Sequence, residues 1–175
     1  MKLAGYPLVL HDKNTAGLSF INDKLFSQFY KKDALLEIQL LQSKTYVLLN
    51  SVEHHPVAYF TLTNDKLCRD LMTSNNAYKK FTYALPQVGR FAEFPAVKLK
   101  IQAVATDYQH LEIASELINS IKKSLIGPSN KSACRFLLVD SRDDAREFFT
   151  KHGFQTIDLK ETHSANPMFF DLLKL

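Results

Sequence analysis

The chain has 175 residues, 46% of them hydrophobic, with 13 Phe and 7 Tyr but no Trp; this predicts one α/β domain over residues 1–175. Its net charge is +4, but the 22 basic residues are dispersed in short pairs such as Lys122-Lys123, which we interpret as solvated surface rather than a nucleic-acid-binding stripe. The apolar runs are too short for a signal peptide or for the roughly 18 residues of a membrane span. The two cysteines are far apart in the sequence, which argues against a disulfide framework. We therefore expect a cytoplasmic protein.

The first half of the chain combines helical and strand patterns. Leucines and phenylalanines at three-to-four spacing predict one or two amphipathic helices over residues 22–41, with Asn22 or Asp23 as N-cap. Two β-rich runs, 45–50 and 57–63, are separated by a polar turn and predict a hairpin. This part of the chain therefore supplies both helix and sheet to the predicted mixed fold.

Two segments of the first half are candidates for a functional role. The hairpin turn holds His54 and His55, but no nearby cysteine or carboxylate completes a ligand set, so we predict no metal. Residues 64–96 form the least regular part of the chain, and long irregular segments often line binding sites. A surface insertion without a role is an equally good interpretation of residues 64–96.

The second half alternates strands and helices. Apolar and polar residues alternate over 97–105, which predicts a strand, and the following helix presents an apolar stripe up to Leu125 before Gly127 and Pro128 end it. The remaining predicted elements are a buried strand at 135–140, a helix from an Asp143 or Asp144 cap to Gly153, and strands near 154–159 and 168–173. This order fits a mixed sheet with helices on both faces.

A strand, a polar loop and a helix follow one another over residues 99–125, which is the arrangement of a phosphate-binding loop. A helix N-terminus offers free N–H groups and a partial positive charge to an anion. Such loops normally carry glycine where the backbone touches the phosphate, but residues 109–114 contain none. The loop thus has the frame of a cofactor site without its usual residues.

These segments together resemble the GNAT acetyltransferase superfamily over most of the chain. Residues 99–114 align without gaps to its signature strand and loop, and the shared positions are Ala103, Val104, Tyr108, Gln109 and Ile113. Val139-Asp140, Ala145 and the run FFTKHGF at 148–154 resemble a second family motif, and NPMFFDL at 166–172 resembles its last strand. The front part, including 18–20, 45–48 and 57–62, is similar to the branch with toxin-type bacterial acetyltransferases.

The resemblance implies a GNAT fold, with a mixed, mostly antiparallel sheet flanked by helices, in which strands 97–105 and 135–140 splay apart. It also implies transfer of an acetyl group from acetyl-CoA to an amine. The pantetheine arm would pair with the strand, and backbone N–H groups of the loop would bind the pyrophosphate. The cofactor-binding residues so implied are Gln102, Ala103, Val104, Gln109, His110, Leu111, Glu112, Ile113 and Ala114.

The loop departs from the family pattern at two positions, because His110 and Glu112 stand where the family has glycine. A carboxylate ~5 Å from a phosphate charge costs up to ~3 kcal/mol at an effective dielectric of 20. Alternatively, the Glu112 carboxylate interacts with the helix dipole and takes the electrostatic place of the phosphate. Both interpretations predict weak or absent binding of acetyl-CoA or CoA.

The position of the family's proton-donating tyrosine is occupied by Phe149, which cannot donate a proton. Losing a general acid typically costs ~10²–10⁴ in rate. Tyr108, Tyr83 and His152 are candidate substitutes, although His152 is more simply a helix-end residue near the last carbonyls.

Two functions therefore stay open. The first is an acetyl-CoA-dependent N-acetyltransferase acting on a small-molecule or protein amine, with a charged tRNA as the one nucleic-acid acceptor that the resemblance suggests. The second is an inactive GNAT-fold protein that binds or regulates a partner. Neither requires a membrane. We expect exposed aromatic residues near Phe91 and Phe94, which would suit a homodimer.

Overall fold

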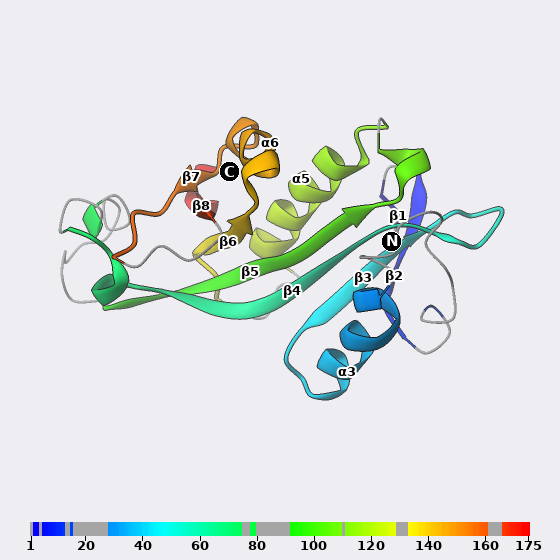
Figure 1. The fold of residues 1–175 in the computed structure, drawn as a ribbon, viewed down its shortest axis with the longest axis horizontal. Helices are drawn as coiled ribbons and strands as arrows, with labels where there is room; N and C mark the ends of the chain where they lie inside the picture. Colours follow the sequence, from blue (N-terminus) through cyan, green and yellow to red (C-terminus); the bar gives the residue numbers. More distant parts are fainter. Residues whose placement is uncertain are drawn as a thin grey trace. The chain divides into compact units, whose positions relative to one another are not determined.

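The computed structural model describes residues 2–3, 5–12, 15, 28–74, 78–79, 92–109, 111–128, 133–160 and 166–175 (Figure 1). Contacts divide the chain into two compact units. Unit 1 comprises Met1–Asn64 and Leu99–Ile121, and unit 2 comprises Asp65–Lys98 and Lys122–Leu175. The long strands β4 (Pro56–Cys68) and β5 (Glu93–Val104) contribute to both. That the whole chain is one domain stays a prediction.

The sheet is mixed and mostly antiparallel, as predicted. Its strand order is β1-β2-β3-β4-β5-β6-β8-β7. The predicted hairpin is confirmed, since β3 (Lys44–Leu49) pairs antiparallel with β4. Within unit 2, the backbone N–H of Arg135 donates to the Pro95 oxygen at 2.9 Å, which ties the start of β6 (Phe136–Ser141) to β5. The predicted splay of these strands concerns residues on both units and stays a prediction.

An N-terminal strand pair in unit 1 has no counterpart among the sequence predictions. β1 (Lys2–Leu3) and β2 (Tyr6–Leu10) form a hairpin, and β2 continues the sheet beside β3. Gly5 lies in the turn with φ +80°, a conformation that glycine adopts without steric cost. The short apolar run YPLVL was too short to distinguish a strand from an irregular segment.

The helical prediction for residues 22–41 is confirmed where the structure describes it. The π-helical turn η1 (Phe29–Asp33) leads into α3 (Ala34–Gln39). Tyr30 is fully buried and donates its hydroxyl proton to the Thr15 carbonyl oxygen. It packs with the core residues Val47, Tyr59, Ala103 and Ala105. The proposed caps Asn22 and Asp23 lie outside the described residues.

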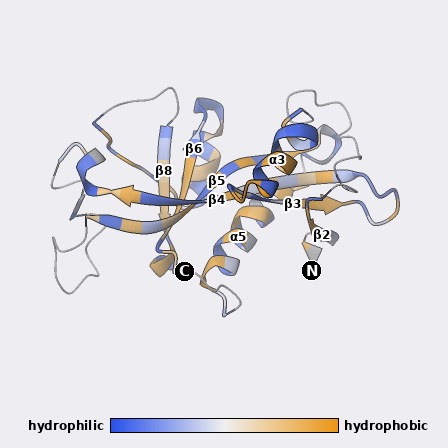
Figure 2. Cartoon of the chain, turned by 90° about the horizontal axis from the view of Figure 1, so that it is seen from below, coloured by the Kyte–Doolittle hydropathy of each residue, from blue (hydrophilic) through white to orange (hydrophobic). Residues whose placement is uncertain are grey.

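The strands of unit 2 form a second core. β6 pairs antiparallel with β8 (Asn166–Asp171), which also pairs with the short β7 (Gln155–Thr156). Every residue of β6 except Asp140 is buried, and Figure 2 shows hydrophobic residues along most of this strand. Phe94 is only 4% exposed and packs edge-on against Phe136. The expectation that Phe94 is an exposed aromatic residue is therefore wrong, and Phe91 lies outside the described residues.

Residues 64–96 are more regular than predicted. Residues 64–68 continue β4, and residues 93–96 begin β5. Between them lies the short 3₁₀ turn η2 (Arg69–Leu71), and residues 80–91 lie outside the described part. The sequence did not predict a strand at 64–68 because the adjacent charged residues Asp65 and Lys66 interrupt its apolar alternation, although Leu67 is buried in the core of unit 2.

The predicted helix before Gly153 is confirmed, but its predicted cap is wrong. The 3₁₀ turn η4 (Asp143–Ala145) precedes α6 (Arg146–Lys151), and neither has a side-chain cap. Asp143 instead accepts a 2.6 Å hydrogen bond from the Asn166 side chain of β8. Gly153 has φ +78°, and a Cβ there would lie 3.1 Å from the Phe170 ring, so glycine is required.

The long helix α5 (Ile113–Ile126) carries the predicted apolar stripe, and Leu117, Ile118 and Ile121 are buried. Lys122 is also buried, at 4% exposure, so its assignment to solvated surface is wrong. Its ammonium group donates to the His152 carbonyl oxygen at 2.5 Å and lies 3.8 Å from the centre of the Phe170 ring. None of the described helices is long and apolar enough to cross a membrane.

Candidate functional site

The end of β5 and the start of α5 lie in unit 1 and frame the predicted cofactor loop. β5 ends at Val104, and the Ala105 N–H donates to the Val57 oxygen at 2.8 Å. The turn η3 (Thr106–Tyr108) follows, and Gln109 is exposed. The loop therefore begins from a strand end that is held to β4.

The backbone at Glu112 has a left-handed conformation, which glycine adopts far more readily than glutamate. Glu112 has φ +56°, in the left-handed region that costs other residues about 1–2 kcal/mol. Its carbonyl oxygen accepts the 3.1 Å hydrogen bond of the Glu116 N–H, so Glu112 is the residue before the first turn of α5. Glu112 thus has a backbone conformation typical of glycine at the position where the sequence resemblance implies a glycine.

Neighbouring contacts fix the first turn of α5. Ile113 is fully buried, whereas Leu111 is exposed. The Gln102 side chain donates from Nε2 to the Ala114 oxygen at 3.0 Å, which ties β5 to the helix. Gln102 Oε1 is buried and has no hydrogen-bond partner among the described residues. The loop is thus anchored on both sides by the strand and by the helix.

Tyr108 belongs to a hydrogen-bonded chain of side chains within unit 1. His55 Nδ1 lies 3.0 Å from Glu53 Oε2, and His55 Nε2 lies 3.0 Å from the Tyr108 hydroxyl. The Asn50 amide donates to the same hydroxyl at 3.0 Å. The phenol thereby holds the loop start to the β3–β4 turn.

We predict that Tyr108→Phe lowers the free energy of unfolding by about 1–2 kcal/mol, because the Asn50 and His55 groups lose their partner in a half-buried position. Tyr46→Phe is the matched control, since no hydrogen bond joins the Tyr46 hydroxyl to a described residue. Urea denaturation of both variants measures the difference. Equal stability of the two variants would show that the chain of hydrogen bonds contributes nothing.

Phe149, which the sequence resemblance aligns with a proton-donating tyrosine, lies in unit 2. Its side chain is 7% exposed and packs edge-on against the rings of Phe148 and Phe154. The His152 ring lies 2.8 Å through Nδ1 from the Phe148 oxygen, as expected of a helix-end histidine. Phe149 is therefore a core residue on α6 that offers no proton.

The structure brings most predicted site residues together. Within unit 1, the end of β5 and the start of α5 carry Gln102, Ala103, Val104, Gln109, Leu111, Glu112, Ile113 and Ala114. His110 and Tyr83 lie outside the described residues. The described residues contain no group of three His, Cys, Asp or Glu side chains that could hold a metal. The contacts of Tyr108 with His55 and Asn50 were not predicted, because more than fifty residues separate them in sequence.

No family model and no curated protein matches the sequence. Solved structures match it over nearly its full length. A KacT mutant with a tyrosine replaced by phenylalanine is 18% identical in sequence and has a TM-score of 0.72. The match covers 96% of this chain and 95% of the KacT chain. AtaT complexed with acetyl-methionyl-tRNAfMet is 18% identical, with a TM-score of 0.73 and the same coverage. AtaTR bound with AcCoA is 15% identical, with a TM-score of 0.71 and 95% of each chain covered.

The architecture is therefore the GNAT fold, as the sequence motifs predicted. Within that class, the chain is similar in fold to the toxins KacT and AtaT.

Proposed function

We propose that this protein is an acetyl-CoA-dependent N-acetyltransferase that binds its cofactor at the loop between β5 and α5. The observation that carries the proposal is the φ of +56° at Glu112. A left-handed glutamate is strained, and strain of this kind persists where the surrounding structure requires that backbone conformation. This conformation is the one that we expect of a loop whose backbone binds a phosphate, and it supports the proposal although the residue is glutamate.

The start of α5 fits a pyrophosphate through its backbone. The N–H groups of Ile113, Ala114 and Ser115 belong to the first turn and have no partner within the helix. A helix of 14 residues places a partial positive charge beside them. The exposed Glu112 carboxylate opposes this attraction and lowers affinity without closing the backbone site.

Acetyl transfer joins the amine nitrogen to the acetyl carbonyl carbon, breaks the carbon–sulfur bond and moves one proton from the amine to the thiolate. Acetyl-CoA supplies the activated thioester. In this chain, Phe149 supplies no proton, and the Tyr108 hydroxyl is already engaged by the His55 ring and the Asn50 amide. We therefore propose slow turnover in which solvent protonates the thiolate.

Phe149→Tyr is expected to raise turnover at least tenfold, because the family resemblance implies a proton-donating tyrosine at this position and a general acid is typically worth ~10²–10⁴ in rate. The measurement is release of free CoA thiol at saturating acetyl-CoA. Phe148→Tyr, which adds a phenol to the neighbouring position of α6, is the control and should leave the rate unchanged. If Phe149→Tyr only destabilises the protein, Phe149 has a packing role alone.

The acceptor class is tested with amines of different kinds. AtaT is a neighbour in fold and was solved with acetyl-methionyl-tRNAfMet. Free amines, peptides and aminoacyl-tRNA should be incubated with acetyl-CoA and the products identified by mass spectrometry. An acetylated amine that requires the protein supports the proposal. Acetyl-CoA binding without transfer to any acceptor would contradict it.

The second candidate is a GNAT-fold protein that binds a partner without catalysis. The absence of a hydroxyl at Phe149 favours it. AtaT was also solved bound to the C-terminus of the antitoxin AtaR, and KacTA as a complex with DNA, so protein partners occur among the neighbours in fold. Turnover by the unaltered chain would exclude this candidate.

A further inference from the structure

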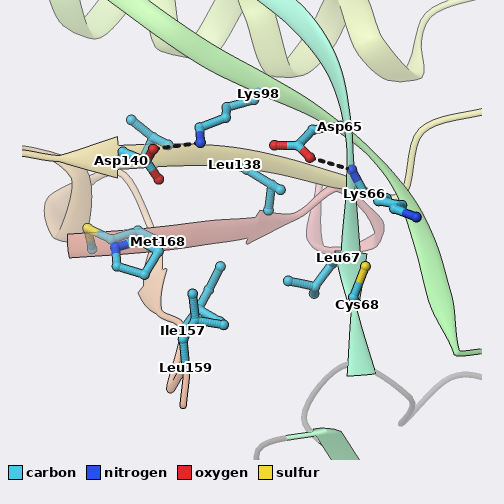
Figure 3. Close-up of a pocket in the computed structure, with 12 residues that line it drawn as sticks. Asp65, Lys66, Leu67, Cys68, Lys98, Leu138, Asp140, Ile157, Leu159 and Met168 are labelled. Carbon is cyan, nitrogen blue, oxygen red and sulfur yellow. Dashed lines mark hydrogen bonds and ion pairs between the residues drawn. The ribbon is translucent and has the colours of Figure 1, made fainter. Parts of the chain in front are cut away.

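Unit 2 contains a pocket of about 240 Å³ that the proposed acetyl transfer does not use (Figure 3). Its lining residues come from β4, β5, β6, β8 and the segment after β7, and all of them belong to unit 2. A dry apolar cavity of about 150 Å³ is large enough to bind benzene, whereas sites for drug-sized ligands measure about 300–1,000 Å³. The pocket therefore suits a ligand with one or two rings.

The inner surface of this pocket is apolar and preformed. Its buried lining residues include Leu67, Leu138, Ile157 and Met168. Leu159 lines the pocket as well and packs against the core of unit 2. Figure 3 shows Leu67, Leu138 and Ile157 extending toward the same space. Because the core holds these side chains in place, an apolar ligand is favoured by the hydrocarbon area that its binding removes from water.

The charged residues of the pocket carry no net charge. Two are acidic and two are basic, namely Asp65, Asp140, Lys66 and Lys98. Lys98 Nζ lies 2.5 Å from Asp140 Oδ2, and Lys66 Nζ lies 2.6 Å from Oε1 of Glu93, which is outside the lining. Asp65 Oδ1 accepts a 2.7 Å hydrogen bond from the Lys66 backbone N–H. A charged ligand would lose its hydration without meeting a net opposite charge, so the pocket favours an uncharged one.

Cys68 adds a neutral thiol to the same lining. Its side chain is half-buried, and Sγ lies 3.8 Å from Glu93 Oε1. Burial raises the pKa of the Cys68 thiol, so it carries no charge at neutral pH. Cys134, the other cysteine of the chain, is also half-buried and also has a pKa raised by burial, but it does not line the pocket. The two thiols therefore provide a reporter of occupancy and its internal control.

We propose that this pocket binds an uncharged apolar molecule of one or two rings, which packs on the surface formed by Leu138, Ile157 and Met168. The site lies on unit 2 alone and is independent of the cofactor loop and of acetyl transfer. It goes beyond the proposed function because it gives the protein a second ligand, selected by apolar burial and by the absence of charge.

Binding is tested by methyl NMR of the full chain labelled at isoleucine and methionine, with three ligands that share a phenyl ring. Titration with toluene should give saturable shifts at Ile157 and Met168, whereas Ile118, which does not line the pocket, should not respond. Benzylamine and benzoate each carry one charge and should bind about tenfold more weakly or less, because their charge must leave water. Leu159→Trp fills the pocket and should abolish the toluene shifts at both residues. Lys160→Trp, at the adjacent exposed residue outside the lining, is the matched control.

Alkylation gives a second readout that requires no variant. Toluene at millimolar concentration should slow the reaction of Cys68 with iodoacetamide about fivefold and leave that of Cys134 unchanged, as measured by peptide mass spectrometry. Saturable shifts with a preference for toluene, and protection of Cys68 alone, support the inference. No shift at Ile157 and Met168, equal binding of a charged ligand, or equal protection of both cysteines would overturn it. None of these outcomes depends on acetyl-CoA, so the proposed function is tested separately.

Discussion

Replacement of Glu112 by glycine is expected to raise the affinity for acetyl-CoA about tenfold. The substitution removes a carboxylate at the residue preceding α5 and leaves the backbone conformation accessible, because glycine adopts φ +56° without strain. At a dielectric of 20, the repulsion between a carboxylate and a phosphate charge ~5 Å apart is up to ~3 kcal/mol. Solvent exposure of Glu112 reduces this repulsion to about 1.4 kcal/mol, which corresponds to a tenfold change in affinity.

Glu112→Gln separates the charge from the backbone strain. Glutamine keeps the strained φ and loses the favourable interaction with the helix dipole, so the protein should become about 0.3–1 kcal/mol less stable. Glycine relieves the strain, and the glycine variant should be about 1 kcal/mol more stable than the glutamine variant. Thermal denaturation and acetyl-CoA titration of both variants test this. If neither variant binds more tightly than the original chain, the Glu112 charge is not the obstacle.

Lys122→Met is expected to change how stability depends on pH. Burial lowers the pKa of the Lys122 ammonium from 10.5 to about 8 in the folded protein. Between about pH 8 and 10.5 the unfolded chain therefore holds more protons than the folded one, and stability rises with pH. Across this pH window, the free energy of unfolding of the original chain should rise by about 2–3 kcal/mol relative to that of the methionine variant, since each pKa unit corresponds to about 1.4 kcal/mol.

The comparison between variants matters because other groups titrate in the same range. Burial raises the pKa of Tyr30, and this contribution is lost as pH rises. The contribution of Tyr30 to stability is the same in both proteins, so it cancels in the difference between their free energies of unfolding. Lys123→Met, at the adjacent exposed lysine, is the control for the loss of one lysine from α5. If the difference in the free energy of unfolding between the original chain and Lys122→Met does not change with pH, burial does not destabilise the Lys122 ammonium.

Sequence patterns predicted the strands and helices whose periodicity was strong. The alternation over 97–105 and the apolar run at 135–140 correspond to β5 and β6, and the stripe ending near Leu125 corresponds to α5. The patterns of β5 and α5 were informative because one face of each element is buried and the other is not. β6 was recognisable as a continuous apolar run, because it is buried on both faces.

Several features of the candidate site and its surroundings depend on contacts that sequence patterns do not encode. The burial of Lys122 depends on a carbonyl group thirty residues away at His152, and the Asp143 cap failed because Asn166 of β8 binds that carboxylate. The positive φ of Glu112 could be suspected only from the family's glycine, since glutamate itself disfavours it. Local propensity predicts elements, whereas tertiary partners decide the role of each polar side chain.

The central claim, that the loop between β5 and α5 binds acetyl-CoA, is tested most directly by calorimetric titration of the unaltered chain. We predict saturable binding at one site per chain, displaced by free CoA, with a Kd about tenfold higher than that of Glu112→Gly. No binding of acetyl-CoA at millimolar concentration by either protein would contradict the acetyltransferase account and favour a protein that uses this fold only to bind a partner.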